Sequence, residues 1–209
     1  MSESRSIRRA AALVFAFVGS SLACSEPEPS SDPFADEVVA FEPAEGSYFG
    51  HERMPEVVLG GPGGSLDVAS LGCEGEIVVR FDEPGIVDGP GVDLIVFENP
   101  FAESFPEPGE VSVSEDGETW WVFACDPESG QGCAGVTPTG ALGNPTDPDR
   151  AGGDGFDLAT LAEGPAQVWF VRVRDRSREH WQPLGMNWCD PGQAGSGGFD
   201  LDALAAVHG

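Results

Sequence analysis

The chain contains no lysine, and its ten basic residues are all arginines. Its 36 aspartates and glutamates bring the formal net charge to -26. A surface of this sign excludes nucleic acid and anionic membranes as default partners, because both would be repelled. The absence of lysine also excludes a P-loop, which needs one to contact the phosphates. Such self-repulsion disfavours a compact chain, and bound cations would relieve it.

Recognisable enzyme motifs are also lacking. The segment AGSGG at residues 194–198 lacks the first glycine of a G-x-S-x-G nucleophile elbow. GQGCAG at residues 130–135 matches G-x-G-x-x-G, but it contains a cysteine and opens no helix, so we interpret it as a chance match. His51, His180 and His208 have no evident nucleophile partner. We therefore predict a non-catalytic protein, with a carbohydrate-active hydrolase that uses paired carboxylates as the alternative.

The amino terminus has the residue order of a secretion signal. Three arginines precede an apolar run at residues 10–18, and small residues lead into Cys24. The run is too short to span a bilayer, so we predict that residues 1–23 are a signal peptide. Because the run leads to a cysteine, the segment resembles a bacterial lipoprotein signal. That resemblance implies lipidation of Cys24 and an outer-membrane or cell-surface location, with an ordinary secreted precursor as the alternative.

No later stretch reaches the length of a membrane-spanning helix. Residues 24–36 are polar and rich in proline, which predicts a flexible linker after the lipidated cysteine. Residues 37–209 are enough for one domain with a substantial core. The predicted organisation is therefore a signal peptide, a lipid-anchored linker and a single exported domain that contacts the membrane only through the lipid.

Four further cysteines, an even number in an exported chain, predict disulfides. Four cysteines allow three pairings. The short separation in CDPESGQGC favours a bond between Cys125 and Cys133, which leaves Cys73 to pair with Cys189. A zinc site is the weaker interpretation, because no C-x-x-C pair occurs and the histidines are scattered.

Short runs rich in valine, isoleucine, phenylalanine and tryptophan recur between turn phrases such as GGPGG, VDGPG and DPESG. In VWFVRVRD the alternation predicts that Val171 and Val173 face inward, whereas Arg172 and Arg174 face water. Only residues 156–162 suit a helix. The pattern predicts an all-β fold, an antiparallel sandwich of jelly-roll type with long loops rich in glycine, proline and aspartate. The predicted strands are 38–41, 56–59, 66–70, 76–81, 93–97, 110–114, 119–124, 167–174 and 199–207.

Several phrases of the chain resemble those of a bacterial family of cell-surface or secreted proteins: LGGPGGSLDVASLGCEGEIVVRFD, IVDGPGVDLIVFENPF, VSVSEDGETWWVF, AGGDGFDLATL and GFDLDALAAVH. That family is similar in outline to galactose-binding-like, discoidin-like sandwiches and to calcium-dependent carbohydrate-binding modules. The resemblance covers most of residues 59–208. It implies a β-sandwich at the cell surface and no particular activity.

The phrase Gly-Phe-Asp-Leu occurs twice, at residues 155–158 and 198–201. In the first copy, glycines around Asp154 and Asp157 allow tight turns in which carboxylates and carbonyls could converge on calcium. The alternative is that these aspartates cap turns or the short helix.

In the second copy, strand alternation predicts that Phe199, Leu201 and Ala203 share one face and that Asp200 and Asp202 share the other. The resemblance to carbohydrate-binding sandwiches implies that Asp202 is a calcium ligand, close to an acid such as Glu37 or Glu42. The alternative is that Asp200 and Asp202 only solvate an exposed face.

The segment VDGPGVDLIVFENPF supplies a further pair of candidate metal ligands, Asp88 and Asp93. Glu98 lies five residues after Asp93, so on an unbroken strand the two face opposite ways. We interpret Glu98 as the end of a turn. Calcium is the cofactor that these acids predict.

Two tryptophans, Trp181 and Trp188, occur in REHWQPLGMNWCDPGQ, which has no strand pattern and predicts a loop. Loop aromatics can stack on sugar rings, so we predict that these two are candidate contacts to a glycan or a surface protein. The alternative is that they cover the core, held by Cys189.

Overall fold

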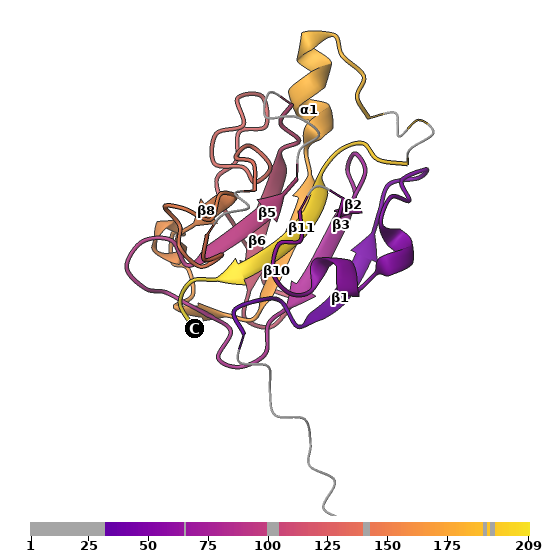
Figure 1. The fold of residues 1–209 in the computed structure, drawn as a ribbon. Helices are drawn as coiled ribbons and strands as arrows, with labels where there is room; N and C mark the ends of the chain where they lie inside the picture. The colour runs from indigo at the N-terminus through magenta and orange to yellow at the C-terminus, as the bar shows by residue number, and fades with distance from the viewer. Residues whose placement is uncertain (1–31, 65, 100–104, 140–142, 190–191, 193–194) are drawn as a thin grey trace, which may run out of the picture.

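The computed structural model describes residues 32–64, 66–99, 105–139, 143–189, 192 and 195–209. Among these residues the chain forms eleven strands, one α-helix and four 3-10 helices. No helix in the described ranges has the length and apolar character needed to cross a membrane. The colour gradient in Figure 1 shows that strands from distant parts of the chain lie next to one another.

The larger sheet contains, in spatial order, β1 (Glu37–Glu42), β3 (Glu76–Arg80), β10 (Phe170–Asp175), β6 (Gly109–Ser114) and β7 (Trp121–Val122). All neighbours in it are antiparallel. On the central strand β10, Val171 and Val173 are buried, whereas Arg174 is exposed and Arg172 is partly exposed. The predicted alternation of VWFVRVRD is therefore confirmed.

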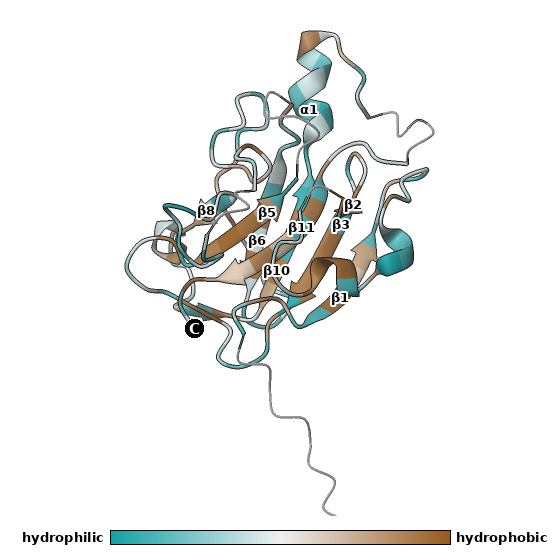
Figure 2. Cartoon of the chain, viewed as in Figure 1, coloured by the Kyte–Doolittle hydropathy of each residue, from teal (hydrophilic) through white to brown (hydrophobic). Residues whose placement is uncertain are grey.

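The second sheet contains, in spatial order, β2 (Ala69–Ser70), β11 (Asp200–Ala206), β5 (Leu94–Glu98) and β8 (Asp154–Phe156), again antiparallel. A small third sheet pairs β4 (Ile86–Val87) with β9 (Gln167–Val168). The main core joins both large sheets, and Figure 2 shows hydrophobic residues along β3 and β5. The chain is an antiparallel all-β sandwich. Members of this core include Ile77, Val79, Val111, Val171, Val173, Leu94, Val96, Leu201 and Leu204.

Strand β5 is buried along its whole length. Leu94 and Val96 face the main core, while Ile95 and Phe97 pack in a second apolar cluster with Ala203. Because both faces of β5 are covered, its sequence is a continuous apolar run rather than an alternation.

Strand β11 contains a β-bulge, which changes the side of the strand on which its first residues lie relative to the prediction. Leu201 pairs with Glu98 and Ala203 pairs with Phe97, so Asp202 is an extra residue in the ladder. Leu201 therefore packs in the main core and Ala203 in the second cluster. The expectation that Leu201 and Ala203 share a face is wrong, because the inserted residue reverses the alternation.

Several local predictions differ from the structure. Residues 56–59 contain the 3-10 helix η2 (Glu56–Val58) instead of a strand, because a short buried apolar run suits either. The stretch predicted as a loop contains α1 (Ser177–Trp181), followed by η4 (Gln182–Leu184). The helix expected at 156–162 is only η3 (Leu158–Thr160). The remaining 3-10 helix is η1 (His51–Arg53).

The folded part of the chain includes residues that precede β1. Phe34 forms a bridge with Ala205, and Ala35 is buried in the main core. The Asp36 carboxylate accepts a hydrogen bond of 2.7 Å from the Asp82 N–H. Packing thus begins by Phe34, within the stretch predicted as linker. The predicted signal peptide and Cys24 lie outside the described residues.

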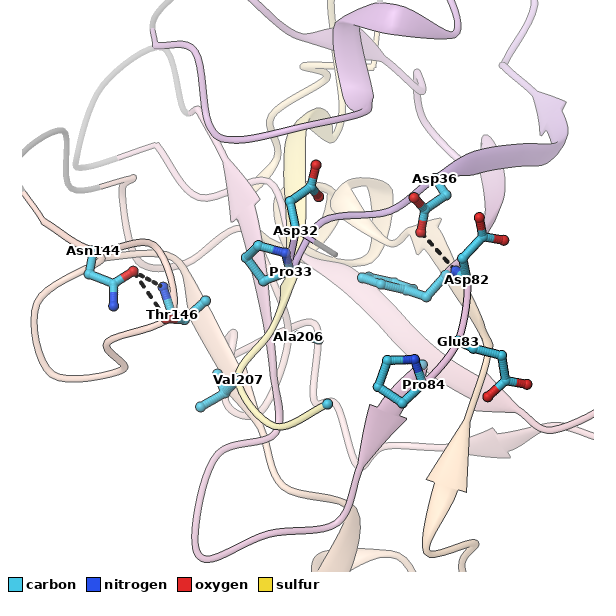
Figure 3. A pocket seen from close by; sticks show the side chains of 13 residues that line it. Asp32, Pro33, Asp36, Asp82, Glu83, Pro84, Asn144, Thr146, Ala206 and Val207 are labelled. Carbon is cyan, nitrogen blue, oxygen red and sulfur yellow. Dashed lines mark hydrogen bonds between the residues drawn. The ribbon is translucent and has the colours of Figure 1, made fainter. Parts of the chain in front are cut away.

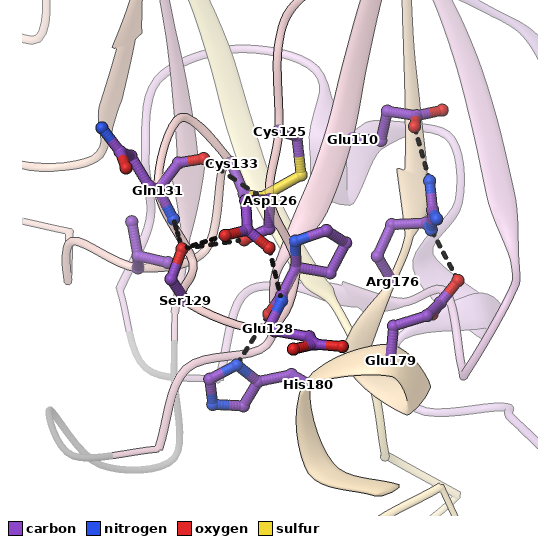
Figure 4. Close-up of a disulfide and its surroundings, with 12 residues drawn as sticks. Glu110, Cys125, Asp126, Glu128, Ser129, Gln131, Cys133, Arg176, Glu179 and His180 are labelled. Atoms are coloured by element: carbon purple, nitrogen blue, oxygen red, sulfur yellow. Dashed lines mark hydrogen bonds and ion pairs between the residues drawn. A yellow bond between two sulfur atoms is a disulfide. The ribbon is translucent and has the colours of Figure 1, made fainter. Parts of the chain in front are cut away.

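Both predicted disulfides are present. Cys73 is bonded to Cys189, and Cys125 is bonded to Cys133. Figure 4 shows the second bond close to α1, where the Nδ1 atom of His180 lies 2.8 Å from the carbonyl oxygen of Pro127. The disulfides therefore fasten loops at the end of the sandwich that carries α1.

Breaking the two disulfides separately is expected to destabilise the domain unequally. In the chain-entropy treatment, a cross-link over 116 residues contributes about 5 kcal/mol and one over 8 residues about 2.5 kcal/mol. The double change Cys73→Ser with Cys189→Ser should therefore lower the free energy of unfolding more than Cys125→Ser with Cys133→Ser. Urea denaturation measures both, and an equal or reversed order would contradict this expectation.

Candidate functional site

Strand β5 has an acidic residue at each end, and each belongs to a different group of carboxylates. Asp93 directly precedes β5, and Glu98 is its last residue. Strands β8 and β11 flank β5 and run antiparallel to it. They place Asp157 near the Asp93 end and Asp200 near the Glu98 end, because Phe156 pairs with Leu94 and Leu201 pairs with Glu98 (Figure 1).

This arrangement explains the repeated Gly-Phe-Asp-Leu. In both copies the phenylalanine and the leucine are buried in the main core. The aspartates differ in position, since Asp157 directly follows β8 and Asp200 is the first residue of β11. The repeat therefore has one packing role and places its two aspartates at opposite ends of β5.

The first group, here called the aspartate cluster, consists of Asp88, Asp93 and Asp157. One carboxylate oxygen from each lies within 4.8 Å of the others. Asp88 is exposed, Asp157 is half-buried and Asp93 is fully buried. The structure thus joins the sequence-derived pair, Asp88 and Asp93, to an aspartate from the first Gly-Phe-Asp-Leu.

Backbone N–H groups hold two members of the aspartate cluster in place. The Asp93 carboxylate accepts hydrogen bonds from Gly89 N–H at 2.7 Å and from Leu158 N–H at 2.8 Å. Asp157 is the N-cap of η3 and accepts from Ala159 N–H at 2.9 Å. The capping alternative therefore holds for Asp157, without removing it from the cluster.

The electrostatics of the aspartate cluster favour a cation. Burial raises the pKa of Asp93, its two backbone donors lower it, and the charges of Asp157 and Asp88 raise it again. The Nε2 atom of His208 is 4.0 Å from Asp93 and has no hydrogen-bond partner. Three converging carboxylates are the oxygen donors that a hard cation such as calcium accepts.

The second group, here called the buried acid cluster, lies toward the other end of β5. Its members approach from both sheets and act on one another electrostatically. Four of them are buried and one, Asp200, is half-buried. They are Glu98, Glu107, Asp154, Asp175 and Asp200.

Asp154 and Asp175 of the buried acid cluster each accept several backbone hydrogen bonds, and Glu107 has one with the backbone of Gly198. Asp154 accepts from the N–H groups of Val136 and Thr137 at 3.0 and 3.2 Å. Asp175 accepts from Glu74 N–H and Phe199 N–H, both at 2.8 Å. These carboxylates connect loops. Asp154 begins β8 and Asp157 follows it, so the two lie toward opposite ends of β5. They therefore do not form one glycine-rich calcium loop.

Glu98 is not satisfied in this way, and Asp200 is satisfied only in part. Among the described residues neither carboxylate oxygen of Glu98 has a hydrogen-bond partner. Asp200 has a hydrogen bond with the Ser70 side chain, but its Oδ1 has no partner in the described part of the chain. Burial raises the pKa of Glu98 well above its usual range, and the charges of Glu107, Asp200 and Asp154 add to this. The backbone N–H of Asp200 is close enough to lower the pKa of Glu98. Its geometry does not amount to a hydrogen bond with either carboxylate oxygen of Glu98.

The neighbouring acids are perturbed for the same reason. Burial raises the pKa of Glu107 well above its usual range, and Asp200 and Asp175 raise it further. Burial raises the pKa of Asp200 to about 6. No ion pair of the described residues involves any member of the buried acid cluster.

Sequence reasoning missed the importance of Glu98, which it interpreted as the end of a turn, and did not single out Glu107. A signal for Glu98 was present. Leu94, Val96 and Glu98 alternate on one face of β5, and the first two face the main core. A glutamate in phase with core residues is a buried carboxylate, which requires a specific partner.

Asp202 has a role that neither sequence interpretation described. It is 2% exposed, and its carboxylate accepts from Gly63 N–H at 2.8 Å and Gly64 N–H at 3.4 Å. Glu37 instead pairs with Arg80 at 3.0 Å. Burial raises the pKa of Asp202 to about 6. Asp202 thus anchors a loop at the β-bulge, and the interpretation of a solvated face is wrong.

The two loop tryptophans occupy different environments. Trp181 is 7% exposed and its ring stacks on Phe105 with 4.5 Å between centroids. Trp188 is 49% exposed, and its Nε1–H donates to the sulfur of Met186 at 3.1 Å. The interpretation as a cover over the core therefore fits Trp181, while Trp188 stays available to a ligand.

Two of the cavities formed by described residues contain no member of the two acid groups. The larger, of about 630 Å³, lies where the first described residues meet the carboxyl terminus, with Asp36 and Asp82 on one side (Figure 3). The smaller, of about 280 Å³, borders α1 and includes Trp181 and Met186. A small molecule in either cavity would not contact the buried acid cluster.

Comparison with known proteins adds no assignment. No protein-family model matches the chain, and no curated protein matches it. Function is therefore inferred from the geometry of the two acid groups and the exposed aromatic surface.

The pKa values predict that the metal-free domain loses stability as the pH rises from about 4 to above 6. Asp175 and Asp202 have pKa values of about 6 in the folded state, against 3.8 for an ordinary aspartate. Between these values the folded state holds protons that the unfolded chain has released, so the free energy of unfolding falls with rising pH. Each such carboxyl accounts for roughly 3 kcal/mol when the change is complete.

Urea denaturation from pH 4 to pH 8 in chelator and at constant ionic strength measures this dependence. Asp202→Asn should reduce the slope, because it removes one titrating group. A free energy of unfolding that rises between pH 4 and pH 7 would contradict the expectation.

Proposed function

We propose that this chain is an exported, lipid-anchored cell-surface protein whose sandwich, of jelly-roll type, is a non-catalytic binding or adhesion module that binds calcium. The observation that carries the proposal is the aspartate cluster, with three carboxylate oxygens within 4.8 Å of one another. The jelly-roll type is supported by the pairing of strands that are far apart in the chain, such as β10 with β3 and β6.

The donor set favours calcium over other common cations. The aspartate cluster offers oxygen atoms, and calcium takes six to eight oxygen ligands in flexible geometry. Zinc usually takes sulfur and nitrogen donors, and the four cysteines of the folded domain are bonded in disulfides. The exposed position of Asp88 leaves room for water to complete the coordination shell.

Export and anchoring have separate support. Two disulfides are typical of an oxidising compartment outside the cytosol. The basic, apolar and small-residue order of residues 1–23 supports a signal peptide, and Cys24 at its end supports a lipid anchor in the outer membrane or at the cell surface.

The candidate ligand is a glycan or a surface protein, and support comes from the exposed aromatic surface beside α1. Trp188 is 49% exposed, and Met186 and Leu184 beside it are 45% and 60% exposed. The hydrolase alternative gains nothing from the buried acid cluster. Glu98 and Glu107 are 0% and 5% exposed, so a glycosidic bond could not reach their carboxylates.

Asp88→Asn is expected to weaken calcium binding at least about tenfold, since a removed charge partner in such a site is worth more than 1.4 kcal/mol. Asp88 is exposed, so the fold should be unchanged. Isothermal titration with calcium measures the affinity. Calcium at a hundred times Kd should also stabilise the wild type by about 2.7 kcal/mol.

Asp149→Asn is the matched control, because Asp149 is an exposed aspartate outside the cluster. Magnesium and sodium chloride test diffuse screening, which would act through ionic strength. Equal affinity in Asp88→Asn and Asp149→Asn would show that the aspartate cluster is not the calcium site.

Trp188→Ala is expected to abolish glycan binding by the domain, because it removes the exposed ring that could stack on a sugar. Leu66→Ala is the control, since Leu66 is 71% exposed and its truncation removes apolar surface that does not belong to the surface around Trp188. A glycan array with and without EDTA, together with a panel of chromogenic glycosides, measures binding and turnover. Turnover of a glycoside would contradict the non-catalytic proposal, and unchanged binding by Trp188→Ala would contradict the role of this surface.

A further inference from the structure

Glu98 is an ionisable side chain inside the protein with no basic group to stabilise its charge in the part of the chain that the structure describes. It is 0% exposed, and neither of its carboxylate oxygens has a hydrogen-bond partner among these residues. Its face of β5 points into the space between the sheets, in phase with Leu94 and Val96. A buried carboxylate without donors is unfavourable unless something else compensates it.

The charged groups that act on Glu98 are further acids, namely Glu107, Asp200 and Asp154. Oδ1 of Asp200 is also buried without a partner. Nearby arginines are engaged elsewhere, as Arg176 is with Glu110 and Glu179. Asp200 otherwise has a hydrogen bond with the Ser70 side chain. Both oxygens of Glu98 and one oxygen of Asp200, on adjacent strands, thus lack partners among the described residues.

We propose that Glu98, Asp200 and Glu107 form a buried binding site for one divalent cation, separate from the aspartate cluster. The strands support this choice of residues. Glu98 and Asp200 lie on the paired strands β5 and β11, while Glu107 comes from the segment that enters β6 in the opposite sheet. A cation here would therefore link the two layers of the sandwich.

Calcium is the cation whose chemistry fits these donors best. All three side chains offer oxygen, and carboxylates with carbonyl groups are the ligands that calcium prefers. Glu98 and Glu107 have long side chains whose oxygens can rotate toward a common ion. This rotation is required, because among described residues only the aspartate cluster places three ligand atoms within 4.8 Å. Asp200 is half-buried and gives the site its contact with solvent.

The titration behaviour agrees with the geometry. The raised pKa values of Glu98 and Glu107 mean that protons and a cation compete for the same oxygens. Cation binding at this site should therefore release protons. This release gives the buried site a readout of its own.

The test counts calcium ions per chain on the intact exported protein by equilibrium dialysis and elemental analysis. We expect two ions in the wild type and one in Glu98→Gln, which keeps the side-chain volume and removes the charge. Glu118→Gln, an exposed glutamate in the hairpin loop, is the matched control and should keep two. When dialysed at a calcium concentration below the weakened Kd of the aspartate cluster, Asp88→Asn should also keep one ion, and the double variant should keep none.

A second measurement covers the case in which the first variant does not fold. Asp200→Asn changes a half-buried member of the site and should also lose one ion. Calorimetric titration in two buffers of different ionisation enthalpy should show proton release in the wild type and in Asp88→Asn. That release should disappear in Glu98→Gln or Asp200→Asn.

The outcomes separate this proposal from the proposed function. If folded Glu98→Gln and Asp200→Asn both keep the wild-type number of ions, the buried site is wrong even where Asp88→Asn loses one. If Glu98→Gln loses one ion while Asp88→Asn keeps the wild-type number, the buried site holds and the aspartate cluster is not a calcium site. A wild type that binds one ion without proton release would overturn the buried site and indicate that Glu98 is kept neutral by a proton.

Discussion

The burial of carboxylates in a chain with few positive side chains is the constraint on which the rest of this structure depends. Arginines pair with acids near the surface, as Arg80 does with Glu37 and Asp82. Inside, the carboxylates rely on backbone N–H groups. Asp93, Asp175 and Asp202 each accept such hydrogen bonds from segments distant in the chain. These acids hold the long glycine-rich loops, so the acidic composition is part of how the domain folds.

Strand β5 organises the two acid groups because it is central and fully buried. At one end Asp93 is fixed by two N–H groups and has neighbours that reach the surface. At the other end the Glu98 carboxylate has no hydrogen-bond partner among the described residues, and the charged groups that act on it are acids. A carboxylate held by donors can be stable without an ion, whereas one without donors requires a proton or a cation. The carboxylate at the Glu98 end of β5 therefore depends more strongly on a bound proton or cation than the carboxylate at the Asp93 end.

The sequence predicted the parts of the fold that local pattern determines. Alternating β-branched runs identified β1, β3 and β10, and cysteine spacing identified both disulfides. Strands β4 and β8 have two and three residues, which is too short for a periodic signal. The two copies of Gly-Phe-Asp-Leu show the same limit for the site. Pairing with β5 decides whether each aspartate precedes or follows its strand, and pairing is a long-range property.

The β-bulge at Asp202 shows how one residue connects packing to charge. Without the inserted residue, Leu201 would face the same side as Ala203, and the main core would lose it. The insertion buries the Asp202 carboxylate, which then needs donors, and the N–H groups of Gly63 and Gly64 provide them. Asp200 lies two residues earlier, before the bulge, and the described chain supplies no donor to its Oδ1. The same strand thus contains one carboxylate that the backbone satisfies and one whose Oδ1 still needs a proton or a cation.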